Sequence, residues 1–156
     1  MVKKRELYKI SERSFLSKFM KTAGIIAEYN PFHQGHIYHI QKTKELTQCD
    51  CLIAIVSNHF TQRGLFNLLT MEDKTKLALE AGCNLVIELP PCYAAQSADY
   101  FAKYAVESLS QLHIDQICFG SETNNISTLK EYSKQMESTQ VVPSLSMNQN
   151  LYTKNI

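Results

Sequence analysis

The 156-residue sequence contains no tryptophan, and no apolar run approaches the roughly 20 residues that a transmembrane helix needs. The basic start does not predict a secretory signal, because Ser17 and Lys18 interrupt its apolar residues. The composition is nevertheless 44% apolar, with eight Tyr and seven Phe, so the chain can bury a core. Its length fits one domain, and we expect no membrane partner.

The spacing of a disulfide framework is also missing. The cysteines number five, an odd count, which favours reduced thiols and a cytoplasmic location. Cys49 and Cys51 form a CxC pair, but on a strand they would point to opposite faces. No second pair with ligand spacing follows, so we predict no zinc site.

The sequence also lacks a strong charge of one sign, since the formal net charge is +1. Residues 1–21 carry seven basic and two acidic residues, whereas the remainder carries nine basic and thirteen acidic residues. The body of the protein is therefore mildly acidic, and its net charge does not indicate nucleic-acid binding.

Buried strands alternate with amphipathic helices from residue 23 onward. Near-continuous apolar runs of this kind are typical of a parallel sheet that is covered on both faces. We therefore predict an α/β, Rossmann-like fold, with its ligand beyond the carboxyl ends of the strands. The expected strands are 23–27, 50–56, 84–89 and 114–119, and the expected helices are 35–46, 72–81 ending at Gly82, one capped by Ser97, and 126–136.

The segment NPFHQGH at 30–36 joins the first strand to the first helix. Gly35 lets a phosphate approach the backbone, and the helix N-terminus presents free N–H groups and a positive dipole end. His33 and His36 lie three residues apart, so both can donate to oxygens that gain charge at phosphorus. The alternative is a histidine pair that only caps the helix.

From Met20 the chain reads MKTAGIIAEYNPFHQGHIYHIQ, followed by QRG at 62–64, LVIELP at 85–90 and FGSE at 119–122. Over residues 20–135 it resembles the bacterial tRNA(Met) cytidine acetate ligases of the HxGH nucleotidyltransferase-like superfamily. The resemblance implies that ATP and acetate form acetyl-adenylate, with Mg²⁺ accompanying ATP. The acetyl group then passes to the wobble cytidine of elongator tRNA(Met).

The resemblance also implies the site. His33 and His36 would be catalytic at the α-phosphate, and Gly120 would line the adenosine side, although a glycine at a strand end can also serve a turn. The implied ATP-binding residues are Ile26, Ala27, Glu28, Tyr29, Asn30, Pro31, Phe32, His33, Gln34, Gly35, His36, Ile37, Tyr38, His39 and Gly120.

Three residues carry open alternatives. Glu28 can orient a loop amide or a magnesium-bound water, or be an ordinary carboxylate at a strand end. His39 continues the spacing of His36 and could complete a three-histidine metal site, but such a residue is more often a surface histidine. Arg63 is either a triphosphate clamp or an exposed loop arginine. His59 has no clear role, and His113 is expected to be structural.

The chain departs from the family at both ends and in one loop. After Gly64 it reads Leu65-Phe66-Asn67, where an acidic residue, proline and small apolar residues are usual. We expect a nucleotide-binding domain at 20–137, an extension at 1–19 that is disordered, a misassigned start or a basic arm, and an irregular tail at 138–156. The family's C-terminal half is missing, so a nucleotide-binding fragment without activity is one alternative. A small-molecule adenylyltransferase is another.

Overall fold

The computed structural model describes the backbone of residues 20–121, 125–139 and 152–155, and side chains within residues 20–121 and 125–135. The predicted extension at 1–19 and most of the predicted tail lie outside the described residues.

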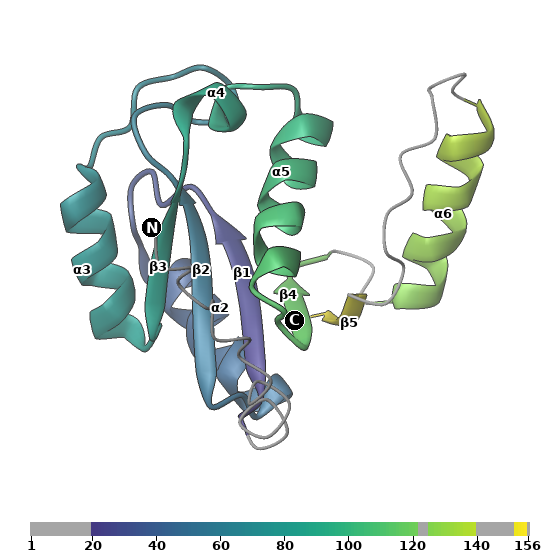
Figure 1. Ribbon diagram of the computed structural model, residues 1–156, viewed down its shortest axis with the longest axis horizontal. Coiled ribbons are helices and arrows are strands. Elements are labelled where there is room, and N and C mark those ends of the chain that lie inside the picture. The colour runs from purple at the N-terminus through teal and green to yellow at the C-terminus, as the bar shows by residue number, and fades with distance from the viewer. Residues whose placement is uncertain (1–19, 122–124, 140–151, 156) are drawn as a thin grey trace, which may run out of the picture.

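A parallel sheet forms the centre of the molecule, with strand order β3-β2-β1-β4-β5 (Figure 1). β1 lies in the middle and pairs with β2 over six residues. The carboxyl ends of β1 and its neighbours therefore meet at one edge of the sheet. The strands are β1 (Thr22–Ala27), β2 (Cys51–Ser57), β3 (Leu85–Leu89), β4 (Gln116–Phe119) and β5 (Tyr152–Asn155).

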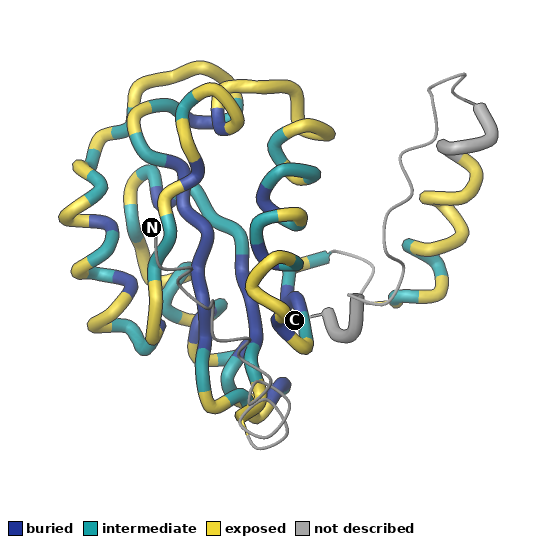
Figure 2. Tube along the Cα trace, in the orientation of Figure 1, coloured by how far each residue is buried: buried dark blue, intermediate teal, exposed yellow. Residues whose placement is uncertain are grey.

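Helices cover both faces of this sheet, which confirms the predicted fold class. Ile40 of α2 and Ala78 of α3 pack with Ala23, Ile25 and Leu52 on one face. Ala105 and Leu109 of α5 and Ala94 of α4 pack with Ile53 and Ile55 on the other. Figure 2 shows the buried residues concentrated along the central strands. The helices are α2 (Gln34–Thr47), α3 (Met71–Ala81), α4 (Pro91–Ala94), α5 (Ala98–Gln111) and α6 (Ile126–Thr139).

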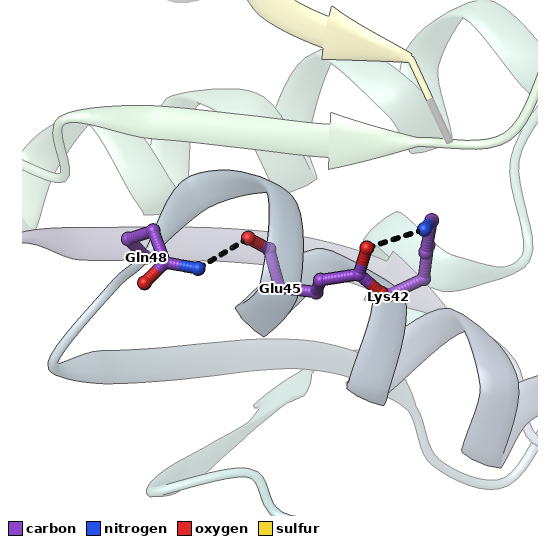
Figure 3. Close-up of polar contacts among 3 residues, drawn as sticks. All are labelled: Lys42, Glu45 and Gln48. Carbon is purple, nitrogen blue, oxygen red and sulfur yellow. Dashed lines mark hydrogen bonds and ion pairs between the residues drawn. The ribbon is translucent and has the colours of Figure 1, made fainter.

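The helix ends follow the sequence with one exception. Gly82 ends α3 at a φ of 119°, as its lack of a side chain allows, and Thr70 caps the start of α3 by accepting from the N–H of Asp73. Ser97 is the N-cap residue of α5, as predicted. Its side chain makes no capping hydrogen bond, however, so it does not stabilise the start of the helix in the expected way. At the far end of α2, Lys42 contacts Glu45 and the Gln48 amide donates to the Glu45 carbonyl (Figure 3).

The C-terminal elements differ most from expectation. The tail expected to be irregular contributes β5, which pairs with β4 at the edge of the sheet. α6 lies beyond this edge (Figure 1), and its described side chains are half-buried or exposed. None of the described helices is both long and apolar enough to cross a membrane.

Candidate nucleotide-binding site

The histidine motif forms the N-terminus of α2. His33 is the N-cap residue, and its Nδ1 accepts from the backbone N–H of Gly35 at 3.1 Å. His36 reaches back, and its Nδ1 accepts from the backbone N–H of His33 at 3.2 Å. This is a reciprocal capping box built from two imidazoles. The capping alternative is therefore present, but it uses only one nitrogen of each ring.

The other nitrogen of each ring is left for a ligand. Because Nδ1 is the acceptor, a neutral ring carries its proton on Nε2, which makes Nε2–H a donor. The two rings stack, with centroids 3.9 Å apart and planes 29° from parallel. The backbone N–H groups of Gly35, His36 and Ile37 already donate to His33. The helix N-terminus therefore contributes its positive dipole end, which stabilises an anion beside the two Nε2–H donors.

Gly35 is needed here for a reason beyond access of a phosphate. A Cβ at this position would lie 2.9 Å from Cε1 and 3.1 Å from Nδ1 of His33. Any larger residue would push the His33 ring away from its capping position. The glycine therefore fixes the geometry of the histidine pair.

Aromatic packing supports His36 from the protein side. The Tyr29 ring meets the His36 ring edge-on at 5.0 Å and the Phe32 ring at 4.8 Å. Tyr29 is fully buried, and burial beside Cys83 raises the pKa of its hydroxyl. A contact between Tyr29 and a ligand would have to come from its backbone.

His36 is neutral near pH 7. Burial, together with repulsion from His33 and His39, lowers the pKa of His36 to about 4. An uncharged donor that is held by its cap needs no reorganisation when charge develops on an oxygen.

His39 does not complete a metal site with the other histidines. It lies on the sheet side of α2, where burial lowers its pKa while a hydrogen bond to the backbone of Cys118 raises it. In the described part of the chain, no three His, Cys, Asp or Glu side chains converge as ligands. The three-histidine alternative was wrong for these residues.

A second set of contacts fixes the loop of residues 58–70, which follows β2. Glu28 Oε1 accepts from the backbone N–H of Gln62, and Asn30 Oδ1 accepts from that of Leu68 at 2.6 Å. Of the alternatives for Glu28, orientation of a loop amide is confirmed. Lys74, fully buried on α3, donates to the carbonyls of Ser57 at 2.8 Å and Asn58 at 3.4 Å.

This loop borders an open cleft of about 450 Å³ at the carboxyl edge of the sheet. Arg63 is exposed and lies in its wall, whereas His59 and His113 do not line it. The sequence did not indicate that α5 contributes to this wall. The lining residues are Glu28, Asn30, Thr61, Gln62, Arg63, Leu65, Ala98 and Phe101.

The other predicted residues are divided between the strand, the loop and the helix. Ile26 and Ala27 end β1, Glu28 to Phe32 form the connection, and Gln34 to His39 form the first turns of α2. Tyr38 is exposed. Gly120 follows β4, the neighbour of β1, and a Cβ there would meet nothing within 4 Å. Its predicted place beside adenosine stays a prediction.

Comparison with known proteins identifies the family. The family described as HIGH nucleotidyl transferase matches residues 20–155. A tRNA(Met) cytidine acetate ligase of Geobacillus sp. (strain WCH70) is 50% identical over 115 residues, which are 74% of this chain and 29% of the relative. One from Clostridium novyi (strain NT) is 48% identical over 116 residues, again 74% and 29%. The chain belongs to the tRNA(Met) cytidine acetate ligase family.

Solved structures agree with this assignment. The crystal structure of Thermotoga maritima TmcAL bound with alpha-thio ATP has a TM-score of 0.73 and 37% identity, over 78% of this chain and 30% of that one. A lipopolysaccharide core biosynthesis protein from Thermoplasma volcanium, at 16% identity and a TM-score of 0.51, shares the fold alone. The chain spans about 29% of the length of its curated ligase relatives and matches their nucleotidyl transferase domain.

Proposed function

We propose that this chain binds ATP at the histidine pair and activates acetate as acetyl-adenylate for acetylation of the wobble cytidine of elongator tRNA(Met). The observation that carries the proposal is the double cap of α2. It holds two Nε2–H donors beside a helix N-terminus, which suits an α-phosphate.

The chemistry asks for positioning rather than a protein nucleophile. An acetate oxygen attacks the α-phosphorus, the bond to the β-phosphate bridging oxygen breaks, and pyrophosphate leaves. His33 and His36 would stabilise the charge that builds on the α-phosphate oxygens. The cytidine amine then attacks the acetyl carbon, releases adenylate and loses a proton.

Mg²⁺ would enter with the phosphates. It is commonly held by one or two protein carboxylates together with phosphate oxygens and water. The charge of the metal would balance that of the triphosphate, whose oxygens and bound water would supply most of its ligands.

Exchange of labelled pyrophosphate into ATP tests the proposal. We expect acetate-dependent exchange that falls about 100-fold or more in His36→Asn. Asn can still accept from the His33 N–H, so the cap persists while the Nε2–H donor is lost. His113→Asn is the matched control, since His113 is exposed at the end of α5 with a φ of 53° that Asn tolerates.

A nucleotide-binding fragment without turnover is the second candidate, and the coverage of 29% of the relatives' length favours it. Calorimetry separates the two: ATP binding that His36→Asn weakens, without exchange in any condition, selects the fragment. Adenylate joined to a phosphate ester as product would select a small-molecule adenylyltransferase instead. Absence of both ATP binding and exchange contradicts the proposal.

A further inference from the structure

The cleft and the histidine pair lie on opposite sides of the end of β1. The histidines begin α2, which packs on one face of the sheet. The cleft is walled by Ala98 and Phe101 of α5, which packs on the other face. Glu28 and Asn30 follow β1, which lies between the two faces, and both residues line the cleft. A second reactant in the cleft would therefore approach the nucleotide from the side away from α2.

The walls of the cleft suit a flat, polar-edged ring. Phe101, Leu65 and Ala98 supply apolar surface on which a ring can lie. Arg63 is exposed in the wall and can bind a phosphate through two parallel N–H groups. A volume of about 450 Å³ is within the usual range for small-molecule sites.

Glu28 is the acceptor in this cleft. Its Oε1 is occupied by the backbone N–H of Gln62, whereas Oε2 has no hydrogen-bond partner among the described residues. The buried ammonium of Lys74 attracts this carboxylate electrostatically and so helps to hold it. An ionised carboxylate only accepts hydrogen bonds, so the group it selects must be a donor.

We propose that this cleft binds the acyl acceptor as a pyrimidine nucleotide, with the exocyclic amine of cytosine donating to Glu28. The ring would lie against Phe101, and Arg63 would bind the adjacent phosphate. Uracil presents a carbonyl where cytosine presents the amine, so it would meet the carboxylate with two acceptors facing each other. This inference rests on the proposed function, which requires an amine-bearing acceptor beside the activated acetyl group.

The Gln62 amide is a direct probe of this contact, because it donates to Glu28. In ¹H–¹⁵N correlation spectra of the ¹⁵N-labelled chain, cytidine monophosphate should shift the Gln62 signal. Uridine monophosphate should bind about tenfold or more weakly. Glu28→Gln keeps an oxygen for the Gln62 N–H but adds an amide donor, so it should erase the preference for cytosine.

Glu88→Gln is the matched control. Glu88 Oε1 accepts from Asn58 Nδ2 next to the same loop, but Glu88 does not line the cleft. Its replacement should leave the preference for cytidine unchanged. The spectra also report directly whether each variant is folded.

Three results would overturn the inference: equal binding of the two pyrimidine nucleotides, no shift of Gln62 with cytidine monophosphate, or a larger shift with adenosine monophosphate. A Gln62 shift produced by Mg²⁺ alone that blocks cytidine binding would assign Glu28 to the metal instead. The same spectra distinguish failure of the proposed function. If the histidine pair does not bind ATP, adding ATP leaves the amide signals of His33 and Gly35 unshifted, whether or not cytidine monophosphate shifts Gln62.

Discussion

At the scale of single residues, the charge state of His36 couples the site to pH. Its pKa is about 4 in the folded chain against 6.5 for a free histidine. Between these values the unfolded chain binds the proton and the folded chain does not, so stability falls as pH falls through this window. We expect the free energy of unfolding by urea to decrease from pH 6.5 to pH 4, and to decrease less in His36→Asn.

His39 contributes in the same direction, since burial also lowers its pKa. The free energy of unfolding of His36→Asn should therefore still decrease with falling pH, although less steeply than that of the wild type. A wild-type stability that is flat between pH 6.5 and pH 4 would contradict the neutral state assigned to His36.

Gly35→Ala separates stability from binding. The new Cβ would displace the His33 ring and break its cap, at a cost of about 0.5–2 kcal/mol. Alanine regains up to about 1 kcal/mol of helix propensity, so the two effects largely offset each other. We expect an almost unchanged unfolding free energy but ATP affinity that is about tenfold lower by calorimetry, since the Nε2–H donor of His33 moves.

Gly82→Ala is the opposite case and the control. Gly82 has a φ of 119° at the far end of α3, where alanine is strained by about 1–2 kcal/mol. This variant should lose stability and keep its ATP affinity. Wild-type ATP affinity in both variants would contradict a role for Gly35 in positioning the His33 ring.

At the scale of elements, Lys74 ties α3 to the end of β2 and so to the loop at the cleft. Lys74→Met leaves two carbonyls without their donor, which costs about 1–3 kcal/mol, but it also removes a buried charge whose pKa burial lowers to about 8. These terms oppose each other. We therefore expect little change in global stability and faster hydrogen exchange at the amides of Gln62 and Leu68.

Lys44→Met is its control, because Lys44 donates to the Gly82 carbonyl at 2.9 Å at the opposite edge of the sheet. It should leave the exchange of these loop amides unchanged. Equal protection of Gln62 in the wild type and Lys74→Met would show that Glu28 and Asn30 hold the loop without Lys74.

The sequence predicted the elements well where one pattern dominated. Four apolar runs became β1 to β4, and Gly82 ended α3 as expected. α4 and β5 were missed, since four residues are too few for a periodic pattern and the pairing of β5 with β4 is a tertiary contact. The buried role of Lys74 was missed for a similar reason, because its partners are backbone carbonyls 16 and 17 residues away.

In the site, too, the sequence predicted what depends on neighbouring residues and missed what depends on tertiary contacts. The motif placed His33, Gly35 and His36 together because they are neighbours in one helical turn. That Phe101 of α5 and Glu28 line the same cleft depends on packing between distant segments, and which ring nitrogens cap the helix depends on side-chain geometry. Periodicity in a single sequence does not report such contacts.

At the scale of the whole molecule, the parallel sheet gathers the β1–α2 connection, the 58–70 loop and the start of α5 at one edge. That edge also carries the most exposed apolar side chains of the described part of the chain. Phe66 is 78% exposed, Leu68 76% and Leu65 63%, all in the loop that departs from the family pattern. Large apolar side chains exposed close together in one loop favour association.

We therefore expect the chain to self-associate through this loop as its concentration rises, and Phe66→Ser with Leu68→Ser to shift sedimentation velocity profiles toward monomer. Phe66 also packs against Phe60, with ring centroids 4.9 Å apart and planes tilted by 39°, so stability should fall by only about 0.5–1.5 kcal/mol. Tyr132→Ser removes an apolar side chain that is 54% exposed on α6, away from the loop, and should change nothing. If Tyr132→Ser reduces association as much as the loop variant does, association is spread over the surface and the altered loop is not its cause.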